Sequence, residues 1–317
     1  HNLMEYTLPR FGINTTFVDP NDIEAFRNAI KPETRLIFGE TVANPRTEVL
    51  DIPKVAEIAH EHHIPLIVDS TTTTPYLIRP FDLGADIVVH SATKFLSGHG
   101  TVMAGLIVDG GTFDWESSDK FPQMTEKYAG FHNLSFVEEF GPAAYIARVR
   151  NEAARDFGAC LAPNSSFLVL NGTETLSVRM DKHISNTKKV VDYLKNHEVV
   201  EWVSHPDLED HPNHELAKAL LPKGSTAVFS FGIKGGRKIG QIFIDRLDLF
   251  SNLANIGDSK SLVIHPASTT HQRMSVEDLE AAGISEGLIR LSIGIEYADD
   301  LIEEMARIPV EVEYASE

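Results

Sequence analysis

Short apolar runs alternate with amphipathic stretches along the first third of the chain. Four runs consist mostly of Ile, Leu, Val and Phe, at residues 35–40, 65–69, 86–90 and 104–109. Between the first two runs, residues 51–60 have helical spacing, with Pro53 in the first turn, where a missing N–H costs little. Fully apolar runs separated by helices predict an α/β sheet that is covered on both faces.

The pattern changes after the fourth run. Residues 112–164 are rich in Phe, Glu and Ser and contain no strand-like run, so they predict loops and helices over a surface. Apolar positions then recur at roughly helical spacing over residues 175–197, which predicts one long helix. Beyond it, two strand-like runs alternate with two helical patterns, at residues 227–233, 238–246, 287–294 and 299–307. We therefore expect a large α/β domain at 1–174, followed at 175–317 by a linking helix and a smaller C-terminal α+β domain.

Composition and charge narrow the class of protein. The chain has 317 residues, of which 42% are hydrophobic and 23% charged, the proportions of an ordinary globular protein with a sizeable core. One cysteine excludes a disulfide scaffold. The formal net charge of −18 repels phosphate backbones, which argues against general nucleic-acid binding. Apolar runs such as 64–68 are far shorter than the ~20 residues of a membrane span. A single cysteine without an evident leader predicts a cytoplasmic protein.

One segment has the residues for covalent chemistry. Ser91-Ala-Thr-Lys94 directly follows the strand that ends at His90. A desolvated lysine can attack a carbonyl as the neutral amine, and neighbouring hydroxyls can bind a phosphate. Asp69 ends the preceding strand, where a carboxylate can pair with a pyridinium nitrogen and keep that ring an electron sink. Taken alone, such a lysine is usually solvated and such an aspartate usually caps a helix. Together, at adjacent strand ends, they are a stronger signal.

These motifs belong to a larger set that resembles the pyridoxal-phosphate enzymes of the Cys/Met metabolism family. That family includes cystathionine γ-synthase, cystathionine lyases, methionine γ-lyase and O-acetylhomoserine sulfhydrylase. The matching segments lie in family order over nearly the whole chain, at residues 40–45, 68–70, 82–94, 265–271 and 283–294. Three further stretches look like the O-acetylhomoserine sulfhydrylase branch, at residues 6–13, 112–164 and 221–236. The resemblance implies the aspartate aminotransferase-like fold (fold type I) of the PLP-dependent transferases, with pyridoxal 5'-phosphate as cofactor.

The resemblance also implies a role for each matching residue. Lys94 matches the Schiff-base lysine, which is also the catalytic proton carrier, and Asp69 matches the pyridinium partner. Further cofactor contacts are implied at Thr71 near the ring, Ser91 and Thr93 at the phosphate, and Asn44 at the phenolic oxygen of the ring. The substrate side is implied to use Arg290 as a bidentate clamp on the carboxylate, with Asn255 and Thr270 nearby. The chain has Ser70 where the family commonly has Asn.

The implied reaction is γ-replacement. Acetate leaves Cγ of O-acetyl-L-homoserine and sulfide or a thiol adds there, giving homocysteine or methionine. The alternatives are a methionine or cystathionine γ-lyase, a cystathionine γ-synthase, or a catalytically inactive homologue that acts as a binding partner in sulfur metabolism. The presence of Lys94, Asp69 and Arg290 argues against the inactive homologue. We expect small-molecule substrates, no nucleic acid, membrane or metal partner, and a homotetramer assembled as a dimer of dimers.

The beginning of the chain is unusual for this family. The sequence starts with His1-Asn2-Leu3-Met4. The family's glycine-containing phosphate loop, its stacking tyrosine and its Tyr-x-Arg segment would all lie upstream of that point, so Tyr6 does not match the stacking tyrosine. We therefore expect an N-terminal segment to be missing and, if it is truly absent, weak binding of pyridoxal phosphate.

Other candidate clusters predict no site. Histidines gather before the second strand and again in a loop rich in Pro and Asp, at His60, His62, His63, His205, His211 and His214. The first group has no clear set of partner ligands for a metal ion, and we expect the second group to be solvated. Cys160 is expected to be a buried or partly buried thiol, with nothing nearby that lowers its pKa.

Overall fold

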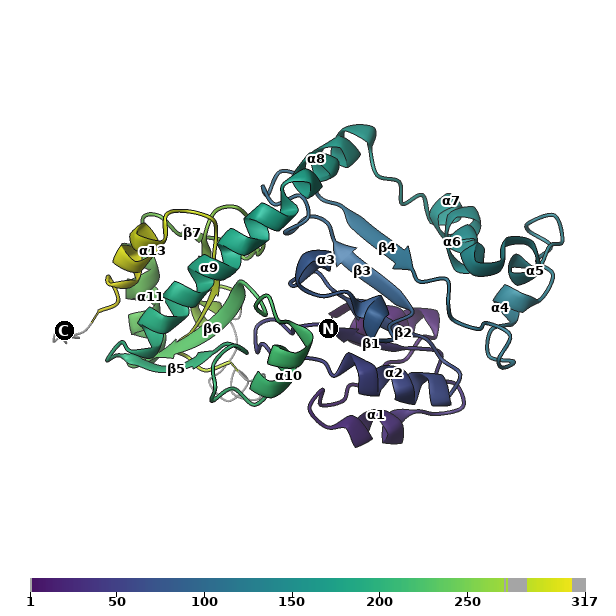
Figure 1. The fold of residues 1–317 in the computed structure, drawn as a ribbon, viewed down its shortest axis with the longest axis horizontal. Helices are drawn as coiled ribbons and strands as arrows, with labels where there is room; N and C mark the ends of the chain where they lie inside the picture. Colours follow the sequence, from purple (N-terminus) through teal and green to yellow (C-terminus); the bar gives the residue numbers. More distant parts are fainter. Residues whose placement is uncertain (1, 271, 273–283, 310–317) are drawn as a thin grey trace.

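The computed structural model describes residues 2–270, 272 and 284–309 (Figure 1). Two sheets form its framework, one from the first third of the chain and one from the last. The first sheet has the order β1-β2-β3-β4, with strands Ile37–Glu40 (β1), Leu66–Asp69 (β2), Ile87–Ser91 (β3) and Gly105–Asp109 (β4). These four strands confirm the four apolar runs. Because β1, β2 and β3 are parallel, their carboxyl ends lie at one edge of the sheet.

Helices pack against this sheet through apolar faces. They are α1 (Ile23–Ala29), α2 (Ile52–Glu61), the single turn α3 (Thr74–Leu77) and the 3₁₀ turn η3 (Pro80–Leu83). Helix α2 confirms the predicted helix at 51–60. Ile52, Val55 and Ile58 are buried on its inner face. The Asp51 side chain accepts the Lys54 N–H and caps the helix, a contact that stabilises a helix by about 1 kcal/mol.

Strand β4 differs from the expected sheet covered on both faces. It pairs antiparallel to β3, and Leu106, Ile107 and Val108 are 39%, 47% and 41% exposed. Residues 92–104 connect β3 to β4 and form no helix, so no crossover helix lies between these two strands. The prediction of a fully covered sheet is therefore wrong for the part of the chain that the structure describes.

Residues 112–164 form turns and short helices, as predicted. The helices are α4 (Pro122–Thr125), α5 (Phe136–Phe140), the 3₁₀ turn η4 (Gly141–Ala143), α6 (Ala144–Arg148), the π-helix η5 (Val149–Ala154) and α7 (Arg155–Phe157). Aromatic packing holds them to the sheet region: the Trp115 and Tyr145 rings stack at 5.5 Å, and Phe121 meets Trp115 edge-on. In Figure 1 this segment lies at the far right, away from the second sheet.

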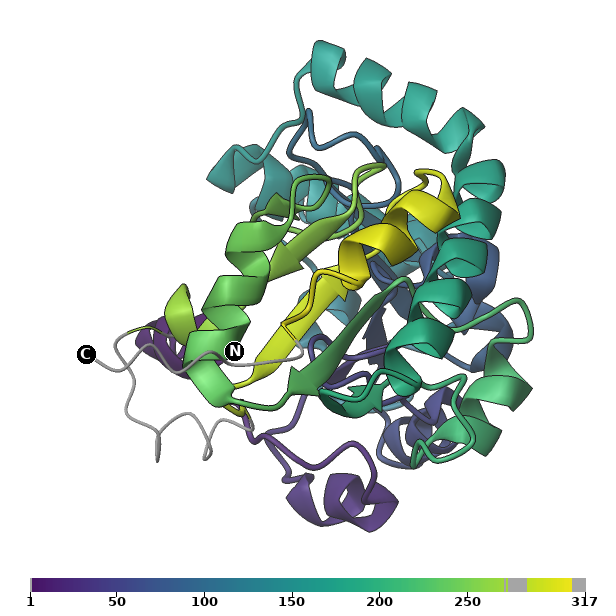
Figure 2. The same ribbon diagram turned by 90° about the vertical axis from the view of Figure 1, so that its left-hand side faces the viewer.

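Two consecutive helices link the two sheets. They are α8 (Pro163–Glu174) and α9 (Leu176–Lys195). In Figure 1 they run diagonally from above the first sheet to beside the second, and Figure 2 shows that the two helices meet at a bend. Helix α9 confirms the long helix predicted at 175–197. Helix α8 was not predicted, because its apolar residues are spread around the helix instead of forming one stripe.

The second sheet is mostly antiparallel and has the order β5-β6-β9-β8-β7. Its strands are Val200–Ser204 (β5), Val228–Ile233 (β6), Ser251–Asn252 (β7), Leu262–Ile264 (β8) and Leu288–Ser292 (β9). Its helices are α10 (His214–Leu220), α11 (Gly236–Arg246) and α13 (Ala298–Met305). Strands β6 and β9 and helices α11 and α13 match the four predicted elements. The 3₁₀ turn η6 (Pro266–Ser268) follows β8.

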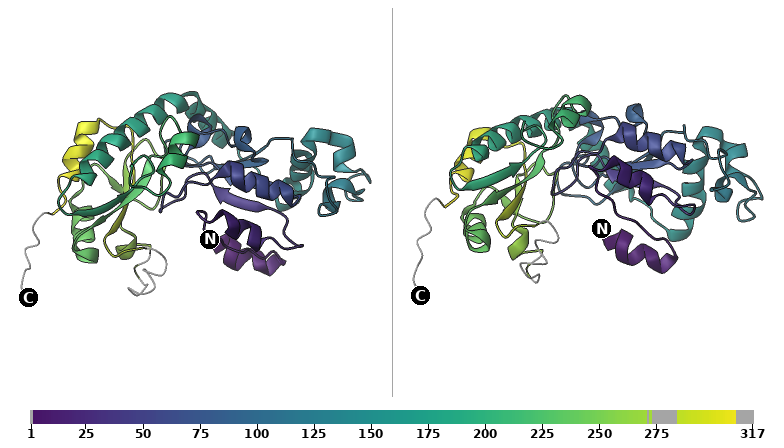
Figure 3. Two further views of the ribbon diagram at one scale, coloured as in Figure 1. Left: turned by 60° about the horizontal axis from the view of Figure 1, so that its bottom comes forward. Right: turned by 90° about the horizontal axis from the view of Figure 1, so that it is seen from below.

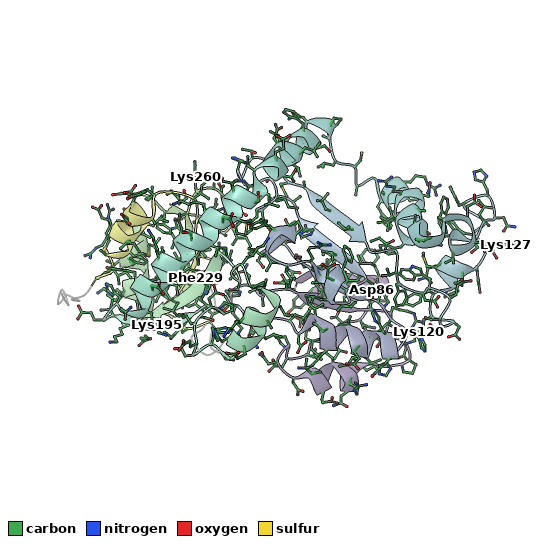
Figure 4. All side chains as sticks on the ribbon, viewed as in Figure 1. Asp86, Lys120, Lys127, Lys195, Phe229 and Lys260 are labelled. Carbon is green, nitrogen blue, oxygen red and sulfur yellow. The ribbon has the colours of Figure 1, made fainter. Side chains whose placement is uncertain are left out.

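Each sheet has its own apolar core. The core of the first sheet includes Val68 and Phe95, and that of the second includes Phe229 and Phe243. Figure 4 labels Phe229 on β6 of the second sheet and Asp86, which directly precedes β3 of the first. Helix α9 contributes to both cores, with Met180 in the first and Leu194 in the second.

The N-terminal turns lie at the surface. They are the π-helix η1 (Leu3–Thr7) and the 3₁₀ turn η2 (Leu8–Phe11), and neither has a buried residue. Figure 3 shows this purple segment set apart from the sheets. Within residues 2–270, 272 and 284–309, no helix combines the length and the apolar character needed to cross a bilayer.

Candidate active site

Lys94 lies in a tight turn directly after β3. Its own N–H donates to the Ser91 carbonyl at 3.1 Å, and its carbonyl accepts the Gly98 N–H at 2.7 Å. The side chain is half-buried. Desolvation, and secondly the Arg290 guanidinium, lower the pKa of Lys94. Both effects favour the neutral amine, the form that attacks a carbonyl carbon.

Asp69 and Ser91 meet at the carboxyl edge of the first sheet, as their strand-end positions predict. An Asp69 carboxylate oxygen accepts the Thr71 N–H at 2.8 Å. The Thr71 hydroxyl accepts the Ser91 N–H, also at 2.8 Å. Glu40, directly across from Asp69 on β1, has a raised pKa because of desolvation and, secondly, the Asp69 carboxylate. Polar groups from three parallel strands thus gather at one edge.

The two hydroxyls expected at a phosphate differ in their surroundings. The Thr93 hydroxyl donates to the Ala104 carbonyl at 3.2 Å and accepts the Ala104 N–H at 2.9 Å. It therefore fastens the turn to the chain that enters β4. The Ser91 hydroxyl forms no hydrogen bond within the described part of the chain, and Ser91 is half-buried. Of the two, Ser91 is the one whose hydroxyl can bind an anion without breaking an internal contact.

Arg290 comes from the other sheet and faces Lys94. One of its Nη atoms donates to the Asn255 carbonyl at 3.2 Å, and the other lies 3.5 Å from Asn44 Oδ1. The Lys94 amine donates to Asn255 Oδ1. Burial lowers the pKa of Arg290. Arg290 is half-buried, and within the described residues no Asp or Glu forms an ion pair with it, so this guanidinium is available to an anionic ligand.

For Thr270, the described contacts give no position relative to Lys94 or Arg290. It lies exposed, just after η6, beside residues that the structure does not describe. Part of the matching segment 283–294 and residue 271 of the segment 265–271 also fall outside the described residues. The place of Thr270 near the substrate stays a prediction.

Sequence reasoning missed residues that hold the site together. The Ser292 hydroxyl accepts the Gly257 N–H at 2.9 Å, and a side-chain carbon at Gly257 would lie only 2.9 Å from Lys94 Cβ. The Ser230 hydroxyl donates to the Pro45 carbonyl at 3.0 Å, next to Asn44. Single serines and glycines carry no distinguishing signal in one sequence, because their contacts depend on segments far away along the chain.

Two expectations outside the site are wrong. His205 is 2% exposed and is bonded to the Thr226 carbonyl at 3.1 Å, so it is not solvated, and His211 is half-buried beside Thr47. Their loop folds against both sheets instead of extending into solvent. Cys160 is exposed, as are most of its neighbours in the connection between α7 and α8. Where the structure describes the chain, no group of three or more His, Cys, Asp or Glu could hold a metal ion.

The chemistry of these groups suits pyridoxal phosphate. A lysine amine with a lowered pKa shares the carboxyl edge of the first sheet with a strand-end carboxylate and with a hydroxyl that has no partner among the described residues. An aldehyde, a pyridinium nitrogen and a phosphate are the three functions those groups bind. The half-buried guanidinium of Arg290 remains for the carboxylate of an amino acid.

Comparison with known proteins agrees with this reading. The family model described as Cys/Met metabolism PLP-dependent enzyme matches residues 1–308. An O-acetyl-L-homoserine sulfhydrylase from Leptospira meyeri is 44% identical over 314 residues, covering 96% of this chain and 71% of that protein. A homocysteine synthase from Schizosaccharomyces pombe is 46% identical over 312 residues, covering 97% and 72%. A sulfhydrylase from Fusarium oxysporum is 47% identical over 304 residues, covering 95% and 70%.

A solved structure is similar over the same extent. It is a putative O-acetylhomoserine (thiol)-lyase from Campylobacter jejuni that contains a pyridoxyl-lysine monophosphate, with a TM-score of 0.92 and 37% identity. The match covers 97% of this chain and 73% of that one. The fold is therefore that of the PLP-dependent transferases, as the motifs imply. Extent, identity and fold agree that the chain belongs to the Cys/Met metabolism family of pyridoxal-phosphate-dependent enzymes.

Proposed function

We propose that this protein catalyses γ-replacement on O-acetyl-L-homoserine, with sulfide as the acceptor and homocysteine as the product. One observation supports it above the others. The Lys94 amine and the unpaired Arg290 guanidinium contact the same residue, Asn255, from opposite sheets. An amino-acid substrate whose carboxylate binds Arg290 would present its Cα–H toward Lys94. The relatives named O-acetyl-L-homoserine sulfhydrylase and homocysteine synthase support the choice of substrate.

Arg290 and Lys94 have separate roles in the proposed reaction. Arg290 binds the substrate carboxylate through two parallel N–H donors, which fixes the orientation of Cα. Lys94, as the neutral amine, takes the proton from Cα, and once it has passed that proton on it takes one from Cβ. As the product forms, a proton returns to Cβ and another to Cα, so none is gained or lost overall. Asn44 and Asn255 hold the Arg290 guanidinium in place through their oxygen atoms. Pyridoxal phosphate, when bound, supplies the electron sink that makes these carbon acids acidic enough to lose a proton.

The cofactor contacts are part of the same proposal. Lys94 would hold the aldehyde, Asp69 the pyridinium nitrogen, Ser91 the phosphate and Thr71 the ring, while Thr93 would support the phosphate contact by fastening the turn to Ala104. Asn44 would contact the phenolic oxygen as well as Arg290, and Thr270 would brace the substrate. We also propose that residues 1–174 and 175–317 form two domains, that the protein acts in the cytoplasm in methionine biosynthesis, and that it is a homotetramer.

A comparison of two substrates tests the reaction. The protein loaded with pyridoxal phosphate is given O-acetylhomoserine with sulfide, or methionine alone. Homocysteine from the first supports γ-replacement, and α-ketobutyrate from methionine alone would show a γ-lyase instead. Lys94→Ala should abolish turnover, since no other described amine contacts Asn255. Lys188→Ala, which removes an exposed lysine on α9, is the matched control and should leave turnover unchanged. Full activity in Lys94→Ala would contradict the proposal.

A further inference from the structure

The turn that bears Lys94 uses nearly all of its backbone carbonyls. The Ala92 carbonyl accepts the Ser97 N–H at 3.0 Å, and the Thr93 carbonyl accepts the Ser97 hydroxyl at 3.0 Å. The Lys94 carbonyl accepts the Gly98 N–H. A single turn between a strand and a loop has no following turn to supply further N–H donors. The next two carbonyls therefore need donors from elsewhere in the fold.

Arg179 of helix α9 supplies those donors. Its Nη1 donates to the Phe95 carbonyl at 2.7 Å, and its Nη2 to the Leu96 carbonyl at 3.3 Å. The same Nη2 donates to the Gly172 carbonyl at 2.7 Å, and Nε to the Thr175 hydroxyl at 3.1 Å. The residue is 5% exposed, and none of the described Asp or Glu side chains pairs with it. Because the N–H donors of a guanidinium lie in one rigid plane, a buried guanidinium that donates only to neutral oxygens fixes the positions of those groups.

Two glycines make this close approach possible. A side-chain carbon at Gly98 would collide with Nη1 of Arg179, and one at Gly172 would collide with the carbonyl oxygens of Leu96 and Ser97. Gly98 has φ +71°, a conformation that other residues rarely adopt. The end of α8 and the start of α9 thus lie directly against the turn, with no side chain between them.

Helix α9 also contacts the segment that follows Arg290. His183, one helical turn after Arg179, donates its Nδ1–H to the Ile293 carbonyl at 2.6 Å. Its ring meets the Phe95 ring edge-on, with centroids 5.1 Å apart. Arg290 lies three residues before Ile293 on β9 and its extension. One helix face therefore touches the turn of Lys94 and the strand of Arg290 at the same time.

We propose that Arg179 is a positioning residue for Lys94. By holding the Phe95 and Leu96 carbonyls it fixes the turn so that the Lys94 amine reaches Asn255 and the substrate bound at Arg290. The proposal rests on the proposed role of Lys94 in the reaction. Arg179 touches neither substrate nor cofactor, and it acts through the backbone of the turn.

The test compares Arg179→Met and Arg179→Lys with the parent protein. Removing the guanidinium leaves the Phe95 and Leu96 carbonyls without their donors, so we expect hydrogen exchange of the amides at residues 92–98 to become faster. The rate at which Lys94 forms a borohydride-reducible bond with pyridoxal phosphate should fall. The kcat should fall by about 10- to 100-fold with KM for O-acetylhomoserine within about twofold, since small misplacements of a reacting group have effects of that size.

A conservative variant separates positioning from general stability. Arg179→Lys keeps one cationic donor and should recover part of the lost kcat. Thr187→Val is the matched control: Thr187 is buried on α9 and its hydroxyl donates only to the His183 carbonyl within the helix. It should leave the exchange of residues 92–98 and the bond-forming rate unchanged.

The outcomes are distinct. Unchanged exchange at 92–98 and an unchanged bond-forming rate in Arg179→Met would overturn the proposal, as would the same losses in Thr187→Val. If Arg179→Met does not fold, Arg179→Lys decides alone: a kcat equal to that of the parent protein would refute the positioning role. Failure of the parent protein to form the reducible bond would instead refute the role of Lys94, and with it the proposed function.

Discussion

At the scale of single residues, we predict different effects for the loss of the Ser91 hydroxyl and of the Thr93 hydroxyl. Ser91→Ala should weaken the affinity for pyridoxal phosphate by about 10- to 150-fold, since a hydrogen bond to a charged group contributes about 1.5–3 kcal/mol. Thr93→Val should lower the free energy of unfolding by about 1 kcal/mol instead, because the Thr93 hydroxyl bonds both backbone groups of Ala104. Titration with the cofactor and urea unfolding measure the two effects. Equal loss of cofactor affinity in both variants would contradict the distinction.

His183 makes a prediction about pH. The pKa of His183 is lowered to about 4, mainly by burial and further by the Arg179 guanidinium. An unfolded histidine titrates near ~6.5. Between these values the unfolded state binds the proton and the folded state does not, so stability falls as the pH decreases. From pH 7 to pH 5 this residue should cost the folded state about 2 kcal/mol.

The measurement for His183 is urea unfolding at the two pH values. His183→Gln, which cannot take up a proton, should lose about 2 kcal/mol less than the parent protein over this interval. Desolvation also lowers the pKa of other buried histidines, such as His90, and these also make the protein less stable as the pH decreases. The test therefore compares how steeply the free energy of unfolding falls with pH in the two proteins. Identical slopes in the two proteins would show that His183 does not titrate as its burial implies.

At the scale of elements, the close contact between α8 and the lysine turn can be tested with a methyl group. Gly172→Ala would push the helix away from the Leu96 and Ser97 carbonyls, and we expect a loss of about 1–3 kcal/mol in the free energy of unfolding together with lower kcat. Gly105→Ala is the matched control, because its new carbon would lie 3.9 Å from the His90 carbonyl oxygen, an ordinary contact. A Gly172→Ala protein as stable and active as the control would disprove the tight packing.

Elements were predictable from sequence where their apolar pattern was long and regular. The strands that end at Asp69 and Ser91 and the helix at 175–197 have such patterns, and the structure confirms them. Strand β8 has three residues, and α10 has seven, too few for a period to be distinguished from chance. Exposure of β4 depends on how the chain returns after β3, and a hydrophobic run alone does not reveal that path.

The residues of the candidate site also differ in how far they could be predicted from the sequence. Lys94 and Asp69 were found because side chains at adjacent parallel strand ends must meet, and Arg290 was found through the family motif. Arg179 was invisible in the sequence: at its place in the period of α9 it reads as one polar residue among several. Its importance comes from carbonyl groups of a turn distant in sequence, and backbone carbonyls are the same in every residue type.

At the scale of the whole molecule, a closed ring of contacts joins the two sheets at the substrate position. Ser230 on β6 is paired with Arg290 on β9, and its hydroxyl donates to the Pro45 carbonyl at 3.0 Å. Asn44 precedes Pro45 and lies 3.5 Å from the Arg290 guanidinium. The second sheet thus fixes the loop of the first sheet that orients its own arginine. Loosening of this particular contact should change carboxylate binding more than proton transfer, because Asn44 contacts Arg290 and has no described bond with Lys94.

Ser230→Ala tests this coupling. Losing one buried hydrogen bond should lower the free energy of unfolding by about 1 kcal/mol. The larger effect should be on KM for O-acetylhomoserine, raised several-fold with kcat nearly unchanged, because Arg290 loses orientation while Lys94 does not. Ser225→Ala is the matched control, since the Ser225 hydroxyl is buried near the start of the same strand and has no described partner. Its removal should leave KM unchanged. A fall in kcat without a rise in KM in Ser230→Ala would mean that the sheets are coupled through the lysine turn instead.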